Sequence, residues 1–577
     1  MQAIQKNRIL IIIGNAPEGQ FTFQVTKHFH TETIKFFREV FGAGDMSELN
    51  KTIVPTKFPN TYLFSDPCDS SINCNNNSYY LSSLFPILKY EAKKVGYEPI
   101  FVALDNFFTF DNNRELVIAG CWKKVLDEIE IIAVSTTFIT SYSLLYKMVD
   151  ILKKEEKKII LGGAFIGKLP HKALESIAMD FCLVSEAEGR FSRLLEIIKK
   201  PLKSSELNTI QGLCWYEKNK GIKHSSAKLK SIDLNTINLE PDREWIKENR
   251  GIIPYEGSRG CAYRCAFCSY PYLLGNNRLR FKTARKIFEE WVALFSLGAR
   301  YIRCYDATFT TPIHRIKELC SLIKSSGMNK SLSWSVTARV SDLLDSSVLE
   351  CMQEAGCKFI FLGIESGDQN ILENMNKKTT VKENADVIQN CNKVGICSTT
   401  SIIVGFPGET EETIKNTKYF LQRNPSPNIR LHTWIPDPSP NVPICRPENV
   451  SRFQIEINNE PVSYRTNIYG DVFDFNMALS WKHVTMNQSQ AFRYSLDISE
   501  SIRIGDICAE DDFFAPYRSF LPQPAVLASF FDYQEHVNFI LGLKDMYNKF
   551  ISGINAELIK KDMSSWLESS GCRQKKI

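Results

Sequence analysis

Three cysteines lie close enough together in the sequence to bind a metal centre. Cys261, Cys265 and Cys268 follow a C-x3-C-x2-C spacing in a short segment that also contains glycines and a proline. Thiolates are soft ligands that suit iron–sulfur clusters. Three of them on one loop can bind three irons of a [4Fe–4S] cube and leave the fourth iron open. The spacing therefore predicts an iron–sulfur cluster with one iron available for chemistry.

Two plainer interpretations of these cysteines remain open. They could form a zinc site, but structural zinc takes four ligands, and no fourth Cys or His lies nearby in the sequence. They could also be unreactive thiols, since the chain has 17 cysteines. The setting favours the cluster, because residues 257–271 resemble the signature of the radical S-adenosylmethionine (SAM) superfamily. The resemblance includes Phe267, an aromatic residue just before the third cysteine, and it implies that the open iron chelates SAM.

The composition narrows the class of protein. The 577 residues suffice for three or four domains, and 44 % hydrophobic and 23 % charged residues are typical of a globular protein. A net charge of +5 gives little reason to expect a nucleic-acid partner. No stretch approaches the roughly 20 apolar residues of a membrane-spanning helix. An odd, high cysteine count fits a reducing compartment, so we expect a cytoplasmic protein with no membrane partner.

The N-terminal third predicts a nucleotide-type sheet. Residues 1–60 form an extension with one strand near Arg8–Gly14 and no assignable function. From residue 61 to 200, apolar runs alternate with amphipathic stretches, which predicts a parallel, doubly wound, Rossmann-like domain. Ligands of such sheets bind at the carboxyl ends of the strands. The expected strands are Tyr62–Phe64, Pro99–Leu104, Ile131–Val134, Lys158–Leu161 and Phe181–Val184, with helices near Leu81–Val95, Arg114–Leu126, Tyr142–Lys154, His171–Ile177 and Phe191–Lys199.

This sheet lacks the usual phosphate-binding motifs. Gly162 to Lys168 fits the spacing G-x4-G-K, but Leu169 and Pro170 follow where a P-loop needs Ser or Thr for magnesium. The pattern G-x-G-x-x-G is also absent. We therefore exclude a P-loop and do not expect a dinucleotide.

The strand ends instead resemble the cobalamin-binding domain that often precedes a radical SAM barrel. The resemblance implies that glycines admit the nucleotide tail and that hydroxyls bond its base. The loop that supplies a cobalt-ligating histidine in many cobalamin enzymes is missing, so cobalamin is expected base-off and without a histidine ligand. The alternative is that these residues only form tight turns in a flavodoxin-like domain. The implied contact residues are Ser135, Thr137, Gly162, Gly163, Glu186 and Glu188.

The middle of the chain predicts a second α/β domain. Residues 201–250 form a linker with a hairpin at Gly212–His224. Residues 251–436 alternate six times between strand and helix, which fits the partial (βα)6 barrel of the radical SAM fold. The expected strands are Ile253–Ser258, Tyr301–Tyr305, Ser333–Ala338, Phe359–Leu362, Thr399–Val404 and Ile429–Trp434, with helices near Ala284–Leu297, His314–Ser325, Asp345–Ala355, Val381–Val394 and Glu411–Arg423.

Several of the barrel's strand ends resemble SAM-binding elements of that family. Glu365 and Ser366 stand in a Gly-x-Glu-Ser-Gly element, and Gly405 lies in a glycine-rich turn expected beside the adenine. The resemblance places Asp306 near the SAM amine. Arg339 is expected to pair with the SAM carboxylate, because an arginine fork suits a carboxylate. Asp306 and Glu365 are also the barrel's catalytic candidates.

Residues 437–577 are aromatic-rich and are expected to close the barrel and contact substrate. Helices are predicted near Val537–Phe550 and Ala556–Leu567. His483 is the third catalytic candidate, with Thr485 and Asp474 as further possible substrate contacts. The alternative for all three is an ordinary core or surface position.

The resemblance as a whole implies a radical SAM enzyme with a [4Fe–4S] cluster, SAM and cobalamin. The leading hypothesis is a C-methyltransferase acting on an unactivated carbon of a peptide or natural-product intermediate, with an electron donor of the flavodoxin or ferredoxin type. One alternative keeps both cofactors but gives cyclisation or rearrangement. A different class would be a cobalamin-type sensory or binding protein with a structural cluster.

Overall fold

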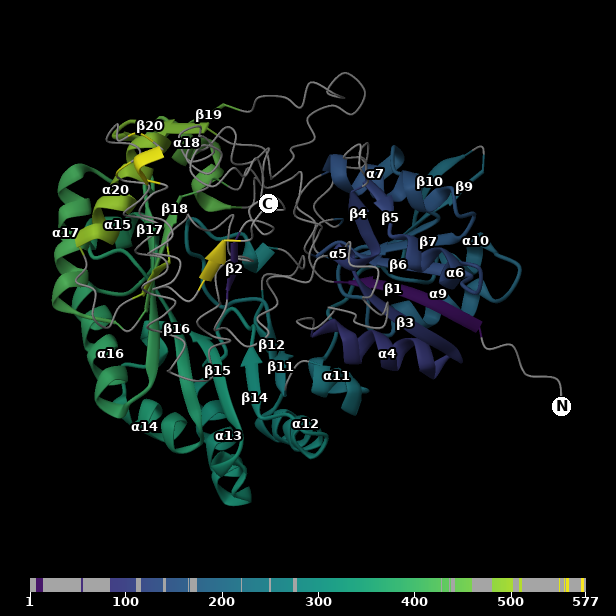
Figure 1. Cartoon of the computed structure of the whole chain (residues 1–577), viewed down its shortest axis with the longest axis horizontal. Coiled ribbons are helices and arrows are strands. Elements are labelled where there is room, and N and C mark those ends of the chain that lie inside the picture. Colours follow the sequence, from purple (N-terminus) through teal and green to yellow (C-terminus); the bar gives the residue numbers. More distant parts are fainter. Residues whose placement is uncertain are drawn as a thin grey trace.

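The computed structural model of the chain has two lobes, each built on a β-sheet (Figure 1). Tyr62–Phe64 and Asp474 lie outside the described residues, and of the two predicted C-terminal helices only residues 549 and 557–559 are described. The structure describes residues 7–13, 53–55, 83–110, 116–137, 142–163, 166, 174–218, 220–248, 251–272, 278–426, 428–434, 436, 442–458, 480–501, 508–510, 549, 555, 557–559 and 572–574.

The N-terminal lobe contains a seven-stranded sheet with the order β10-β9-β8-β7-β6-β1-β3. Its five strands from β3 to β8 are parallel, and the predicted hairpin β9–β10 extends the sheet in antiparallel fashion. The strands are β1 (Asn7–Ile13), β3 (Tyr97–Ala103), β6 (Ile131–Ser135), β7 (Lys158–Gly162), β8 (Phe181–Leu183), β9 (Leu213–Glu217) and β10 (Gly221–His224).

Helices cover both faces of this sheet because its central strands are apolar on both sides. Ile9, Ile11 and Ile13 of β1 join one core with α4 (Leu84–Lys94) and α9 (Arg190–Ile198). Leu10 and Ile12 join a second core. That core includes residues of α7 (Tyr142–Lys153) and α6 (Lys123–Leu126). The prediction of a parallel sheet with helices on both faces agrees with this arrangement.

Two features of the N-terminal lobe differ from the prediction. β1 is no part of a separate extension over residues 1–60, because it pairs with β3 on one side and β6 on the other. The helix predicted over Arg114–Leu126 is instead a strand, a turn and the short α6. Leu116 and Ile118 are buried, whereas the residue between them is only partly buried. They belong to β5 (Leu116–Ile118), which forms a hairpin with β4 (Phe108–Phe110), just after α5 (Leu104–Phe107).

The linker binds to both lobes. Trp245 of α11 (Arg243–Glu248) stacks on Phe85 of α4, with ring centroids 5.0 Å apart. Asn235 accepts a hydrogen bond of 2.8 Å from the backbone of Thr283 in the second lobe. The short α10 (Ser204–Leu207) precedes the hairpin.

The second lobe is built on a parallel sheet with the order β11-β14-β15-β16-β17-β18-β22. Figure 1 shows its helices along the outer side of the sheet, where Ile302 and Trp334 are buried. Arg303, Thr337 and Phe361 lie on the opposite, inner face and are partly exposed. The strands are β11 (Ile252–Tyr255), β14 (Tyr301–Cys304), β15 (Ser333–Ala338), β16 (Cys357–Glu365), β17 (Cys397–Val404), β18 (Asn428–Thr433) and β22 (Cys508–Glu510). The helices are α12 (Ala284–Ser296), α13 (Ile313–Ser326), α14 (Ser346–Glu354), α15 (Gln369–Asn374), α16 (Val381–Val394) and α17 (Glu411–Arg423).

The C-terminal region packs over the carboxyl ends of β17 and β18. It contributes α18 (Pro447–Phe453), a small antiparallel sheet of β19 (Glu456–Asn458), β20 (Ser480–His483) and β21 (Met486–Asn487), and α20 (Gln488–Ser501). Trp481 packs edge-on against Trp434, with ring centroids 5.0 Å apart. Two short pairs, β12 (Ser258–Arg259) with β13 (Arg280–Phe281) and β2 (Ile53–Pro55) with β23 (Cys572–Gln574), complete the sheets. Across the described ranges, every helix is too short or too polar to cross a membrane.

Candidate active site

The loop that carries the three cysteines is held from three directions. It begins after β12 at Gly260, where φ is +79° and a Cβ atom would collide with the carbonyl group of Arg278. Ala266 donates its backbone N–H to the carbonyl of Met375 at 2.7 Å and accepts from Ile444 at 2.9 Å. These bonds fix the loop against both the end of α15 and the C-terminal region.

The three thiols, which all lie within the described residues, do not converge on a site for a single metal ion. Among the described residues, no group of three His, Cys, Asp or Glu side chains is close enough to hold one metal ion. Each cysteine of an iron–sulfur cube ligates a different iron, so wider separation is expected. Burial raises the pKa of Cys268 to about 12, and nearby Cys265 and Cys261 add to the shift. The raised pKa of Cys268 means that a metal must displace the proton of this thiol on binding.

Arg339 lies beside the cysteines with part of its hydrogen-bonding capacity unused. It ends β15, is 5 % exposed, and its Nη1 lies 3.4 Å from Sγ of Cys265. Its guanidinium stacks 3.9 Å from the centre of the Tyr263 ring. Within the described structure, Nε and Nη2 have no hydrogen-bond partner. A buried fork with free donors fits the carboxylate of SAM bound at the open iron.

Glu365 occupies a strained position at the end of β16. Its φ is +71°, in the left-handed region that a non-glycine residue rarely adopts. Its Oε1 lies 3.0 Å from Nζ of Lys377, and both residues are buried. Gly363 leaves the space for this pair, since a Cβ there would lie 2.6 Å from Oε1 of Glu365. Strain of this kind is a feature of functional sites.

Ser366 and Gly405, the two other predicted SAM contacts of the second sheet, differ in their surroundings. Ser366 turns away into the fold, where its hydroxyl pairs with Thr417 at 3.2 Å and accepts from the backbone of Asp368. Gly405, with φ of +87°, forms the tight turn after β17. Glu409 accepts a hydrogen bond from the backbone of Gly405, and burial raises its pKa to about 8. The aromatic ring of Phe267 reaches this turn at the next residue, Phe406, with centroids 6.4 Å apart.

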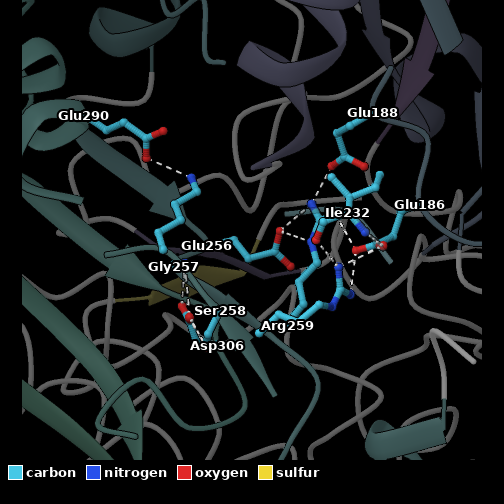
Figure 2. Close-up of polar contacts among 11 residues, drawn as sticks. Glu186, Glu188, Ile232, Glu256, Gly257, Ser258, Arg259, Glu290 and Asp306 are labelled. Carbon is cyan, nitrogen blue, oxygen red and sulfur yellow. Dashed lines mark hydrogen bonds and ion pairs between the residues drawn. The ribbon is translucent and has the colours of Figure 1, made fainter. Parts of the chain in front are cut away.

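Asp306, which was predicted near the SAM amine, follows β14 and is buried against the segment that leads into the cysteines. It accepts hydrogen bonds from the backbone of Gly257 at 3.1 Å and the hydroxyl of Ser258 at 2.5 Å (Figure 2). Burial raises its pKa to about 6, while the Ser258 bond limits the shift. Its observed role is to hold the start of the cysteine loop.

His483 is also enclosed rather than presented to a ligand. Its ring stacks on Trp481 with centroids 5.4 Å apart. Nε2 lies 3.2 Å from the carbonyl oxygen of Gly405, and Nδ1 lies 3.1 Å from the hydroxyl of Thr485. Burial lowers its pKa. Both ring nitrogens thus take part in packing the C-terminal region on the Gly405 turn, and a catalytic role for His483 stays a prediction.

The carboxyl edge of the N-terminal sheet keeps exposed hydroxyls beside a glycine turn. Ser135 and Thr137 follow β6 and lie 3.2 Å apart at their hydroxyls. Thr136, between them, is buried and bonded to Gly162 and Ile166. Gly163 has φ of +104°, and a Cβ there would lie 2.8 Å from the backbone nitrogens of Thr136 and Thr137. β6 adjoins β1 at the point where the strand order reverses, which is where such sheets bind nucleotides.

Glu186 and Glu188 are not available to a cofactor, in contrast to the prediction. Both carboxylates bind Arg259 of β12, at 2.9 Å and 2.5 Å (Figure 2). Glu186 also pairs with Arg280 at 2.8 Å. The two glutamates therefore join the N-terminal lobe to the segment that leads into the cysteines.

Comparison with known proteins identifies the second lobe. Residues 255–421 match the Radical SAM superfamily. The chain contains a radical SAM domain. Proteins of this superfamily bind a [4Fe–4S] cluster and SAM, in agreement with the three cysteines and with the free donors of Arg339.

The curated relatives share this domain at modest identity. An uncharacterized methyltransferase of Pyrococcus horikoshii is 27 % identical over 303 residues, which are 51 % of this chain and 64 % of the relative. A putative methylthiotransferase of Methanocaldococcus jannaschii is 27 % identical over 305 residues, 52 % of this chain and 65 % of the relative. The chain thus spans less than two thirds of the length of these relatives.

Solved structures extend the likeness to both lobes. TsrM of Kitasatospora setae, a radical SAM methyltransferase solved with its tryptophan substrate and a SAM analogue, has a TM-score of 0.59 at 14 % identity, covering 81 % of this chain and 96 % of that chain. OxsB, a cobalamin-dependent radical SAM enzyme solved with aqua-cobalamin and SAM, has a TM-score of 0.56 at 16 % identity, covering 85 % of this chain and 72 % of that chain. At these identities the likeness shows the fold.

Several residues around the radical SAM site were missed by sequence reasoning. Lys377 lies 12 positions after its partner Glu365. The only signal for it in the sequence is that it belongs to a pair of lysines just before a helix cap. Tyr263, between two of the cysteines, donates to Asp342 at 3.2 Å and supports the Arg339 guanidinium. Arg259 stands two residues before Cys261, where a basic residue near the signature could have drawn attention.

Proposed function

We propose that this chain is a cobalamin-dependent radical SAM methyltransferase that methylates an unactivated carbon of a peptide or natural-product intermediate. The observation that carries the proposal is that one chain contains two such sites. The first is the cysteine loop beside the unpaired donors of Arg339, and the second is a parallel sheet with a glycine turn at its carboxyl edge. The TsrM-like fold over most of the chain supports the same function.

On the radical SAM side, the chain's residues hold and orient SAM. Cys261, Cys265 and Cys268 ligate three irons, and Arg339 directs Nε and Nη2 to the SAM carboxylate. We assign the adenine to the Gly405 turn, where the ring of Phe267 packs against Phe406. When bound, the cluster and SAM supply a carbon-centred radical, and cobalamin supplies the methyl group.

Glu365 and Lys377 form a buried ion pair beside Cys268. Burial is the main cause of the raised pKa of Cys268, and the negative charge of nearby Glu365 adds to it. With Lys377 at 3.0 Å, the carboxylate is held in one orientation. We assign this pair to the SAM ribose and amine side of the site, since a carboxylate accepts from both groups.

On the cobalamin side, the fit is partial. The hydroxyls of Ser135 and Thr137 and the turn of Gly162 and Gly163 are placed to accept a nucleotide tail. Glu186 and Glu188 are bound to arginines instead. Reduction of the cluster requires an external one-electron donor, for which a flavodoxin- or ferredoxin-type protein is the proposed class.

The test is anaerobic reconstitution with iron, sulfide and cobalamin, followed by turnover with methyl-deuterated SAM. Tryptophan, short peptides and products of neighbouring genes serve as the substrate panel. A product carrying the deuterated methyl group supports the proposal. Deoxyadenosine formed with an unlabelled, cyclised or rearranged product would overturn methylation and favour the alternative enzyme class.

A matched pair of cysteine variants checks the site. Cys265→Ala is expected to abolish cluster binding and SAM cleavage, because it removes one of three thiolate ligands. Cys121→Ser, at an exposed cysteine of the N-terminal lobe, should retain both. Iron content and the visible absorption of the cluster measure the difference, and retained SAM cleavage by Cys265→Ala would refute the cluster assignment.

A further inference from the structure

We infer that Arg259 is a positioning residue that ties the cysteine loop of the radical SAM domain to the N-terminal lobe. It acts through the interface ion network, which consists of Glu186, Glu188, Glu256, Arg259 and Arg280. The inference rests on the proposed function only in assuming that the cysteines hold the cluster. It assigns to Glu186 and Glu188 the task of placing the two lobes rather than of binding a cofactor.

All three sides of the Arg259 guanidinium are occupied by carboxylates. Nε donates to Glu256 at 2.8 Å, Nη1 to Glu186 at 2.9 Å and Nη2 to Glu188 at 2.5 Å. Figure 2 shows the three acids converging on this one side chain. Two of the acids come from the loop after β8, and the third precedes β12. Only a planar fork with donors on every edge can satisfy such an arrangement.

Arg280 completes the network from the neighbouring strand β13. It donates from Nη2 to Glu186 at 2.8 Å and from Nη1 to the carbonyl of Ile232 in the linker at 2.8 Å. The network therefore connects the N-terminal lobe, the linker and the radical SAM domain. The hairpin β12–β13 that bears both arginines also carries Gly260 and leads directly into Cys261.

Because these side chains are buried, the ion pairs favour one relative placement of the two lobes. The side chains of Arg259, Glu186 and Glu188 are 6, 3 and 8 % exposed. Burial is the largest single effect and would raise the pKa of Glu188, but the charge and the hydrogen bond of Arg259, with smaller contributions from the backbone and Arg190, together lower that pKa. A buried charge that loses its partner is strongly disfavoured. The lobes therefore cannot shift without breaking several such contacts together.

The backbone of the acidic loop is bent to deliver its two carboxylates. Ser185, a non-glycine residue, has φ of +72°, and Gly189 has φ of +69°. The left-handed conformation at Ser185 costs free energy and persists only where the surroundings impose it. Arg190 secures the loop from behind by donating to the carbonyls of Val184 and Gln211. This strained turn is a second, independent sign that the placement of Glu186 and Glu188 matters.

The first test introduces Glu188→Gln in the N-terminal lobe and measures amide hydrogen exchange in the cofactor-free protein. The substitution keeps the shape of the side chain and removes its charge. We expect exchange in the peptide covering residues 257–268 to rise about tenfold or more, the increase in local opening that follows when a hydrogen bond to a charged group is weakened, while β6 and β7 remain unchanged. Because no cofactor is present, this result does not depend on the proposed function.

The second test uses the reconstituted protein. Glu188→Gln should retain iron but alter the EPR signal of the reduced cluster with SAM bound, and SAM cleavage should slow about tenfold. If the wild-type protein never cleaves SAM, the proposed function fails while the exchange experiment still decides the inference.

Two further variants make the outcome decisive. Lys93→Met removes a half-exposed pair with Glu240 that also joins α4 to the linker, and it should leave the cysteine loop unchanged. Arg259→Gln combined with Glu188→Gln removes one charge of each sign, so it should fold and still show the faster loop exchange. Unchanged exchange in the loop, or an equal rise across the whole molecule, would overturn the inference.

Discussion

At the scale of single residues, Arg339 shows how one side chain can serve two partners. Its Nη1 faces Cys265, whereas Nε and Nη2 stay free at the same buried position. Tyr263 supports the flat face of the guanidinium and is itself held by Asp342. The ring fixes the plane of the fork before any ligand arrives, which reduces the entropy lost on binding.

Replacing this fork should weaken SAM binding and spare the cluster. In Arg339→Lys the charge remains but bidentate hydrogen bonding is lost, so SAM affinity should fall about tenfold, equivalent to about 1.4 kcal/mol. Calorimetric titration of the reconstituted protein measures the loss. Arg264→Lys, at an exposed arginine of the same loop, is the control. Loss of iron from Arg339→Lys would show that the residue instead maintains the loop.

Glu409 should make stability depend on pH near neutrality. Burial raises its pKa to about 8 in the folded protein from an ordinary value of 4.5. The folded state therefore favours the protonated form. Its stabilising contribution is complete below pH 4.5 and is lost as pH rises through about 8, at about 1.4 kcal/mol per pKa unit.

Glu409→Gln removes this titration and keeps an oxygen to accept from Gly405. Urea unfolding at pH 6 and pH 8.5 should show a smaller pH-dependent loss of stability in the variant than in the wild-type protein. Equal losses in the two proteins would contradict a neutral Glu409.

Sequence patterns were most informative where the residues of a candidate site are neighbours in the chain. The cysteine spacing and the Arg339 strand end needed only neighbouring positions. The sequence did not show that Asp306 bonds Gly257 and Ser258, because these residues lie 49 and 48 positions earlier in the chain. Glu186 was assigned to the cofactor because its partner Arg259 lies 73 positions away in the sequence. No local sequence pattern indicates that the two residues pair.

At the scale of elements, apolar periodicity predicted the second lobe closely. β15 and α16 have the predicted bounds, Ser333–Ala338 and Val381–Val394. A capping box of Thr380 and Glu383 fixes where α16 begins. The β4–β5 hairpin was missed because strands of three residues are too short to display a period.

The Gly405 turn packs the second sheet against the C-terminal region. A methyl group added at Gly405 should disturb this packing. In Gly405→Ala the new Cβ would lie 2.5 Å from Cβ of Ala491 and 2.7 Å from the Trp481 ring. Overpacking and the positive φ together should destabilise the protein by about 2–4 kcal/mol in denaturant unfolding.

Gly395→Ala separates the two contributions. Gly395 caps α16 with φ of +75° and has no atom within 4 Å of a built Cβ. It should cost only about 1 kcal/mol. Equal losses of stability in the two variants would mean that the C-terminal region moves aside for the added methyl group at Gly405 at no cost in free energy.

At the scale of the whole molecule, the two sheets share one buried core and one buried ion network. The larger core includes Ile9 of β1, Trp245 of the linker and Trp334 of β15. Together with the interface ion network, this continuity fixes the carboxyl edge of one sheet relative to the cysteine loop of the other. Sequence reasoning predicted the two lobes but not this junction, because it depends on contacts between distant segments.

The central place of β1 has a consequence for the synthesis of the protein. β1 is synthesised before its two neighbours in the sheet, because β3 and β6 begin only at Tyr97 and Ile131. At about 5–20 residues per second, its apolar segment waits several seconds for each partner. Shielding of Ile9 to Ile13 on the nascent chain therefore influences the yield of folded protein before any cofactor can bind.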